Sequence, residues 1–172
     1  MSALTAQVIR TRRLDLQPLC VEHAPEMAAV LGDPALYTFI GGTPDTEQAL
    51  LSRYRRLTAG SPDPAVTWLN WVLRLRDEAC LTGTVQATLV ADGCGLLAEV
   101  AWVLGSPWQG RGLATEAARG LIDWLSRQPV HTVIAHIHPD HQASTAVATA
   151  AGLTPTDERH EGEIRWRRII RR

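Results

Sequence analysis

The stretch that decides the fold runs Val103-Leu104-Gly105-Ser106-Pro107-Trp108-Gln109-Gly110-Arg111-Gly112-Leu113-Ala114-Thr115-Glu116. An apolar, strand-like run ends at Leu104, a glycine-rich loop follows, and apolar residues at helical spacing begin at Ala114. Glycine lets a ligand approach the backbone closely. A helix N-terminus presents unpaired N–H groups and a partial positive charge. The stretch therefore predicts an anion site, most often one for phosphate, between a strand and a helix.

Two common phosphate-binding motifs do not fit these residues. No Lys-Ser/Thr pair follows the glycines, so the loop is not a nucleotide P-loop with a magnesium ligand. The dinucleotide-binding pattern is incomplete, because Thr115 occupies the place of its third glycine. An ordinary turn between a strand and a helix stays open on this stretch alone.

Upstream of the loop, the chain reads as three consecutive strands, at residues 68–75, 81–90 and 97–104. The segment Ala91-Asp92-Gly93-Cys94-Gly95 is typical of a hairpin turn between the last two. Short connections of this kind predict an antiparallel meander. Before it we expect a strand at 12–19, a helix at 24–31, and a helix from Asp45 with Gln48 in capping-box position.

Downstream, apolar residues at helical spacing predict a strongly amphipathic helix from Ala114 to Leu125. A strand at 132–137, a helix at 143–151 and a strand at 163–170 follow, with one more short strand near 153–157. The order is β-α-α-β-β-β-α-β-α-β(β). It predicts a mixed α+β fold in one domain, residues 1–172, with a mostly antiparallel twisted sheet of roughly six to seven strands and about four helices.

Composition narrows the class of protein. The chain has 172 residues, 45% of them hydrophobic and 20% charged, with a net charge of −1. These values argue against disorder and against a general attraction to nucleic acid. No apolar run is long enough to cross a membrane, and the N-terminus carries no secretory signal pattern. The three scattered cysteines form no CxxC pair and favour a reducing, cytoplasmic compartment.

The motifs together resemble one family. Gln109-Gly110-Arg111-Gly112-Leu113-Ala114 matches Q/R-x-x-G-x-G/A, the pyrophosphate-binding motif of the GCN5-related N-acetyltransferases (GNAT). Further on, the segment 138–153 resembles that family's second cofactor segment, N-x-x-S-x-x-V-L-x-x-x-G-F, with His141 in place of Asn and Leu153 in place of Phe. The opening at 12–24 resembles the RimJ/RimL-like branch, which acetylates ribosomal-protein alanines.

The resemblance implies a site for acetyl-CoA as cosubstrate. The backbone of the strand before the loop would pair with the pantetheine arm, and one N–H near Leu104 would point at the thioester carbonyl. Backbone N–H groups from Gln109 to Thr115 would hold the pyrophosphate, with Arg111 adding a charged contact or lying solvated at the surface. The residues expected at this site are Trp102, Val103, Leu104, Gln109, Gly110, Arg111, Gly112, Leu113, Ala114, Thr115, His141 and Ser144.

Amine acetylation needs a base, because an ammonium has no lone pair. Glu99 is the candidate, since it lies in an otherwise apolar run on the strand that leads to the loop. An exposed strand glutamate is the alternative, and Asp157, Glu158, Glu161 and Glu163 are further candidates. Ser144 replaces the tyrosine that often protonates the leaving thiolate in the family; alternatively, it caps its helix. The acceptor site is expected from 33–46, the 60–67 loop and the turn near His160, with Trp68 and Trp71 as lining or as core residues.

The function that follows is acetyl-CoA-dependent transfer of an acetyl group to a primary amine by direct attack in a ternary complex. The amine belongs to a protein N-terminus or to a small molecule. Three alternatives stay open: a non-catalytic acyl-CoA-binding or sensor module, use of another acyl-CoA such as succinyl-CoA, and an unrelated nucleotide-binding protein. The spacing of His136, His138 and His141 does not complete a zinc site, so no metal is expected. We expect no nucleic-acid or membrane partner, and a monomer or a homodimer.

Overall fold

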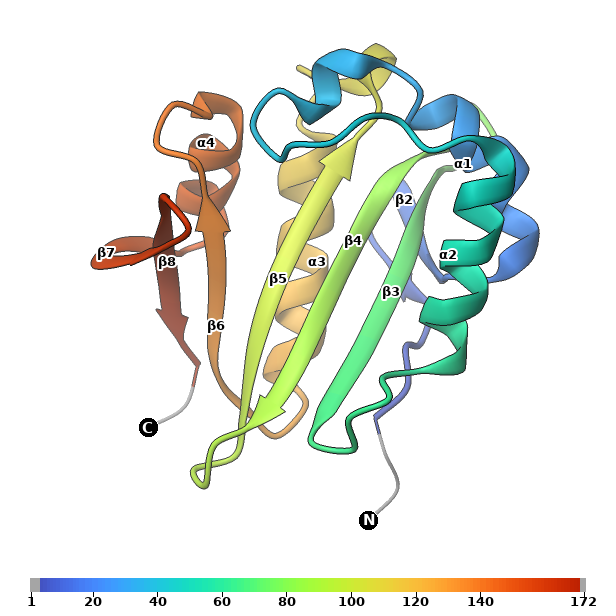
Figure 1. Cartoon of the computed structure of the whole chain (residues 1–172). Coiled ribbons are helices and arrows are strands. Elements are labelled where there is room, and N and C mark those ends of the chain that lie inside the picture. Colours follow the sequence, from blue (N-terminus) through green and yellow to red (C-terminus); the bar gives the residue numbers. More distant parts are fainter. Residues whose placement is uncertain (1–3, 171–172) are drawn as a thin grey trace.

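The computed structural model describes residues 4–170, which contain one eight-stranded sheet with helices on both faces (Figure 1). The strand order is β1-β2-β3-β4-β5-β6-β8-β7. The strands are β1 (Ile9–Arg10), β2 (Leu14–Pro18), β3 (Val66–Leu75), β4 (Cys80–Ala91), β5 (Leu96–Leu104), β6 (Val130–Ile137), β7 (Thr154–His160) and β8 (Glu163–Ile169). The α-helices are α1 (Ala24–Val30), α2 (Glu47–Ala59), α3 (Leu113–Ser126) and α4 (Gln142–Ala150).

Strict alternation in the central strands separates the two faces of the sheet. Leu69, Trp71 and Leu73 of β3 are at most 2% exposed and belong to the core that α3 and α4 cover. Val72, between them, joins Met27 and other apolar residues of α1 and α2 in a second core on the opposite face. A period of two therefore sends successive side chains into different cores.

The second core is confined to one half of the sheet. Helices α1 and α2 lie over the β2–β4 side, whereas no helix covers the same face of β5, β6 and β8 (Figure 1). Glu99 and Ala101 of β5 are accordingly exposed on that face, while Ala98 and Val100 beside them are buried under α3. The uncovered half leaves this face of β5 open to an incoming molecule.

Strands β5 and β6 form the only parallel pair among the described strands, and they pair over a short distance. Their register runs from Leu96 opposite Val130 to Glu99 opposite Ile134, and no pairing continues beyond that point. On its other edge β5 pairs with β4 as far as Leu104. The residues from 100 to 104 therefore have one strand edge without a partner strand.

A β-bulge shapes β4 beside this open edge. Leu73 pairs with Gly83 and Arg74 with Leu81, so Thr82 is the extra residue on β4. Its hydroxyl donates to the Leu73 carbonyl oxygen, 3.1 Å away, and its own carbonyl oxygen accepts from the Gly105 N–H at 2.7 Å. The bulge thus fixes the point at which β5 ends and the glycine loop begins.

The mixed α+β class, the antiparallel meander and the order of elements are confirmed. The sheet has eight strands because the two-residue β1, too short to show a pattern, pairs with β2. Helix α2 begins two residues after the expected Asp45, and its N-cap is Thr46, whose hydroxyl accepts from the Ala49 N–H. The short strand expected near 153–157 is β7. Within residues 4–170 no helix is both long and apolar enough to cross a membrane.

Candidate active site

A cavity of about 260 Å³ opens where β5 and β6 separate. Both strands line it, β5 through residues 100–103 and β6 through residues 135–137, followed by His138. Ser144 of α4 and His141 at its N-cap form another side. Its lining includes consecutive residues of β5, whose side chains point to opposite faces of the sheet.

The glycine loop joins the end of β5 to α3. Gly110 and Gly112 have φ angles of +76° and +77°, which favour glycine because a Cβ atom is strained there. Gly112 is the N-cap of α3, and the first bond within the helix runs from the Glu116 N–H to its carbonyl oxygen. The N–H groups of residues 113–115 therefore have no partner within the helix and can bind an anion.

Side chains around the loop hold its shape. Gln109 donates from Nε2 to the Leu104 carbonyl oxygen, 2.9 Å away, and so ties the loop back to the last residue of β5. Leu113 is fully buried in the main core, so only its backbone can reach a ligand. Gln109 and Leu113 act in the structure as supports for the loop backbone.

The Arg111 guanidinium turns toward the β3–β4 turn. Its Nη2 lies 2.7 Å from Oε2 of Glu78, and the Trp108 indole donates to Oε1 of the same carboxylate. The hydrogen bond from Arg111, supported by that from Trp108, lowers the pKa of Glu78. Both ion-pair side chains are 44% exposed, so the pair is a surface contact of small energy.

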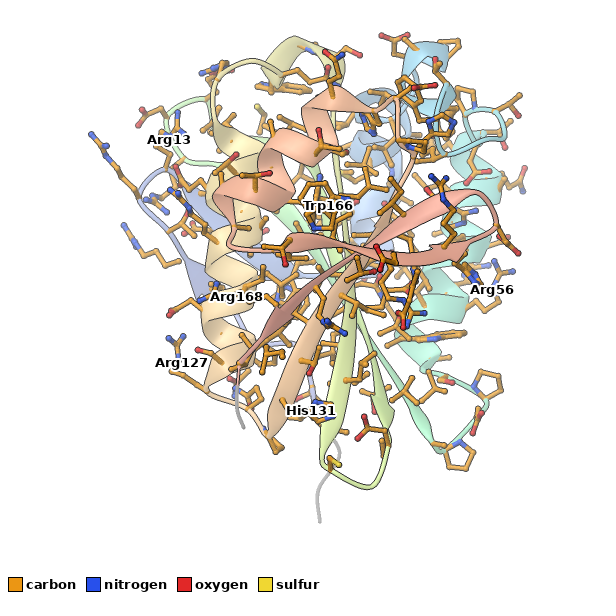
Figure 2. All side chains as sticks on the ribbon, turned by 90° about the vertical axis from the view of Figure 1, so that its left-hand side faces the viewer. Arg13, Arg56, Arg127, His131, Trp166 and Arg168 are labelled. Carbon is orange, nitrogen blue, oxygen red and sulfur yellow. The ribbon has the colours of Figure 1, made fainter. Side chains whose placement is uncertain are left out.

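A more buried ion pair holds the start of α3. Glu116 accepts from the Thr11 hydroxyl at 2.5 Å, from the Arg13 N–H at 2.7 Å and from Arg13 Nε at 2.7 Å. Burial by itself would raise the pKa of Glu116, but these hydrogen bonds outweigh it and the pKa is lowered. Arg13 also donates from Nη1 to the Arg111 carbonyl oxygen in the glycine loop. Figure 2 shows Arg13 beside the end of α3 opposite Arg127.

The segment between α1 and α2 reaches the cavity through Phe39 and Ile40. The Phe39 ring stacks on His141 with centroids 4.6 Å apart, and tilts against His138 at 5.2 Å. Burial, together with the neighbouring His138, lowers the pKa of His141. His141 therefore offers a neutral imidazole beside Ser144 near neutral pH.

Glu99 stands at the base of the separation, in the last position of β5 that pairs with β6. Its side chain is 48% exposed, and its Oε1 lies 2.9 Å from Nδ1 of His136, whose side chain is 9% exposed. His136 lines the cavity and Glu99 is adjacent to it through this contact. Of the other acidic candidates, Glu163 lines the cavity, and Glu158 is paired with Arg165 of β8 at 3.2 Å.

Two expected parts of the acceptor site lie elsewhere. Val66 is paired with Val90, so the 60–67 loop sits at the opposite end of β3 and β4 from the cavity. Trp71 is fully buried in the main core and donates from its indole to the Gln7 carbonyl oxygen, which makes it a packing residue. The 33–46 segment and the turn at His160 do approach: Phe39 lines the cavity, and the His160 ring lies 5.0 Å from that of His136.

Sequence reasoning missed Thr84 and Gln86, which line the cavity from β4. They are polar residues alternating with buried Val85 and Ala87, and this alternation was a usable signal for an open face. The contact between His136 and Glu99 was also missed, because no sequence spacing relates the two residues. Among residues 4–170, no group of three or more His, Cys, Asp or Glu side chains is placed to hold a metal ion.

Solved structures share this fold at low identity. An acetyltransferase of the GNAT family from Bacillus anthracis superposes with a TM-score of 0.79 at 17% identity, covering 95% of this chain and 99% of that one. RimL, a ribosomal L7/L12 α-N-protein acetyltransferase in complex with coenzyme A, gives 0.75 at 16% identity, covering 95% and 98%. AAC(6')-Ib in complex with paromomycin and acetyl-CoA gives 0.73 at 15% identity, covering 91% and 93%.

A comparison with curated proteins finds no match. The acetyltransferase (GNAT) domain family, in contrast, matches residues 13–154, which span the glycine loop, the β5–β6 separation and α4. The match covers well over half of the chain. The chain therefore belongs to the GNAT acetyltransferase family and is an acyltransferase.

Proposed function

We propose that residues 1–172 form a single domain that transfers an acetyl group from acetyl-CoA to a primary amine, by direct attack in a ternary complex. The observation that carries the proposal is the unpaired edge of β5 at 100–104, which runs directly into the glycine-shaped N-terminus of α3. An extended arm that carries amide groups and ends in a pyrophosphate fits this strand edge and the loop and helix N-terminus at residues 110–115 that follow it, which we call the cradle. The GNAT membership of the chain supports the same ligand.

The backbone from Trp102 to Leu104 would pair with the pantetheine arm, and an N–H near Leu104 would donate to the thioester carbonyl. An oxyanion donor of this kind contributes about 10²- to 10³-fold in rate. The N–H groups from Gly110 to Thr115, those of Leu113 and Ala114 included, would hold the pyrophosphate. His141 and Ser144 would meet the arm from the α4 side of the cavity.

The transfer needs three proton movements. Glu99 accepts a proton from the acceptor's ammonium, and the freed nitrogen forms a bond to the thioester carbonyl carbon while the carbon–sulfur bond breaks. The acylated nitrogen then loses its second proton to solvent, which leaves the neutral amide. The Ser144 hydroxyl donates a proton to the departing thiolate and recovers one from solvent. The acceptor enters from the face of β5 and β6 that no helix covers, where Glu99 is exposed (Figure 1). It is a protein N-terminus or a small-molecule amine.

The first test is binding, measured as thermal stabilisation by acetyl-CoA, CoA, ATP and NAD. A ligand at 100 times its Kd stabilises a fold by about 2.7 kcal/mol, which raises the Tm of a domain this size by roughly 5–10 °C. We expect this rise with acetyl-CoA and CoA. A larger rise with ATP or NAD, or none with acetyl-CoA, would contradict the proposal.

The matched variants are Gly112→Glu and Gly60→Glu. Both positions have a positive φ angle, +77° and +92°, and both changes add one negative charge. Gly112 caps α3 at the cradle, whereas Gly60 ends α2 on the far side of the sheet. We expect G112E alone to lose the stabilisation by acetyl-CoA. An amine screen that follows thiol release, with Glu99→Gln as the catalytic variant, then tests transfer; loss of a general base lowers kcat by about 10²- to 10⁴-fold.

A further inference from the structure

A row of polar side chains crosses the sheet at the point where β5 and β6 separate. His136 Nδ1 lies 2.9 Å from Glu99 Oε1, and Arg165 Nε lies 3.1 Å from His136 Nε2. Arg165 Nη1 in turn lies 3.2 Å from Glu158 Oε2. The row links four strands, β5, β6, β8 and β7, and its centre is the nearly buried imidazole of His136.

The donor at one end decides the tautomer of the imidazole. Arginine has only N–H donors and stays charged in proteins. The Nε2 atom of His136 therefore accepts the hydrogen bond from Arg165 with its lone pair, and the ring proton sits on Nδ1. That Nδ1–H faces the Glu99 carboxylate at ion-pair distance, and an ionised carboxylate can only accept hydrogen bonds.

This arrangement excludes His136 from taking the proton of the acceptor amine. Both ring nitrogens are engaged, and protonation of Nε2 would break the bond with Arg165 and set two positive charges against each other. Glu99 has one carboxylate oxygen in contact with His136 and a second that forms no hydrogen bond or ion pair with any described side chain. The geometry leaves that second oxygen to meet the substrate.

We propose that His136, held by Arg165, is the positioning residue that keeps the Glu99 carboxylate in place at the mouth of the β5–β6 separation. The inference rests on the proposed function, because it assigns a support to the base of that reaction. Other groups close to the row are His160, whose ring lies 5.0 Å from that of His136, and Glu163, which lines the same cavity. Within residues 4–170, neither of them forms a hydrogen bond with His136.

The tautomer can be measured without any turnover. Nitrogen-15 chemical shifts of histidine-labelled protein distinguish an Nδ1–H ring, an Nε2–H ring and an imidazolium. We expect His136 to be an Nδ1–H ring in the native protein, and to lose this state in Arg165→Gln, which cannot donate from the same position. An Nε2–H ring or an imidazolium in the native protein at neutral pH would overturn the inference, whether or not an amine substrate has been found.

A pair of amide variants tests the function of the contact. Asparagine places its amide nitrogen close to the Nδ1 position of histidine, and glutamine places its own close to Nε2. We expect H136N to keep the donor to Glu99 and most of kcat, and H136Q to lower kcat by up to roughly 10²-fold, because a misplaced catalytic group costs that much. The stabilisation by acetyl-CoA should be the same in both.

His131→Asn is the matched control. His131 lies on β6 as well, and its Nε2 contacts Asp92 at 2.8 Å, but at the end of the strand away from α4 (Figure 2). We expect H131N to leave kcat unchanged. If H136N and H136Q lose kcat equally, to the level of E99Q, His136 is itself the base and the inference fails. If both lose only stability, with kcat per folded molecule retained, the contact is structural and the inference also fails. An absence of turnover in the native protein with all amines would instead refute the proposed function.

Discussion

Strand β5 is paired with β4 along all of Leu96–Leu104, but with β6 only as far as Glu99. The pairing along the first edge is antiparallel and continuous, whereas the pairing along the second is parallel and ends halfway along the strand. Backbone N–H and C=O groups that lie inside a protein need partners. The open half of the second edge therefore lacks partners that water or a ligand must supply. One strand is thus scaffold on one edge and, in the proposed function, binding surface on the other.

The edge of β5 that pairs with β4 depends on a close approach between the backbones of the two strands at Gly83. A Cβ atom added there would lie 2.2 Å from the Val103 carbonyl oxygen, which is backbone and cannot turn away. We expect Gly83→Ala to lower the free energy of unfolding by about 3 kcal/mol, the upper range for overpacking, and to abolish stabilisation by acetyl-CoA because Val103 and Leu104 must move. Urea unfolding and thermal shift measure both.

Gly162→Ala is the comparison variant for Gly83→Ala. Its added Cβ atom would have nothing within 4 Å, so it carries only the strain of a positive φ angle. That strain costs about 1 kcal/mol. Equal effects of the two substitutions would show that the β4–β5 contact does not hold the open edge in place.

On the open edge, Ser144 faces the cavity from α4. We expect Ser144→Ala to lower kcat by roughly 10²-fold, the lower range for a proton donor, with unchanged stability. Thr149→Ala, which removes an exposed hydroxyl bonded to the Thr145 carbonyl on the same helix, should change neither kcat nor stability. If S144A retained the native kcat, Ser144 would not be the proton donor and would only pack against the cavity.

The hydrogen bonds from Thr11 and Arg13 to the Glu116 carboxylate hold the cradle at the start of α3. Losing hydrogen bonds to a charged group costs about 2 kcal/mol, so Glu116→Gln should be less stable than the native protein by that amount at pH 7. The pKa of Glu116 is lowered by folding. Its contribution is therefore complete above the unfolded pKa of about 4.3 and is lost as pH falls through the lower folded value.

Urea midpoints measured between neutral and acidic pH should show the difference between native protein and E116Q shrinking on the acid side. Asp123→Asn is the control on the same helix, since its ion pair with Arg127 is 70% and 60% exposed. Asp123→Asn should lower the free energy of unfolding by less than about 1 kcal/mol at any of these pH values. A pH-independent gap for E116Q would contradict the assigned hydrogen bonds.

The smallest effect is expected at Arg111. Because its guanidinium is paired with Glu78, Arg111→Ala should weaken the affinity for CoA by less than about threefold, as for other exposed ion pairs. A direct bond to the pyrophosphate would be charge-assisted and worth more. A tenfold or larger, salt-sensitive loss in calorimetric titration would show that Arg111 leaves Glu78 when the ligand binds.

The elements of the fold were predictable because their signals are local. Alternation in 97–104 and helical spacing from Ala114 each reflect one buried face. Contacts between distant segments were not predictable in the same way. The expected Asp45 cap differed from the observed Thr46 by a single residue. The 60–67 loop, which was expected at the acceptor site, lies at the end of β3 and β4 away from the cavity, because only strand register decides where a loop lies.

By itself, the sequence determined the elements, the glycine loop and the family resemblance, because side-chain periodicity and motif spacing are properties of neighbouring residues. Tertiary structure alone decided that β5 and β6 part after Glu99, that Arg111 turns to Glu78, and that His136 stands between Glu99 and Arg165. These contacts join residues 29 or more positions apart. No local pattern encodes them, because they depend on how whole strands are set side by side.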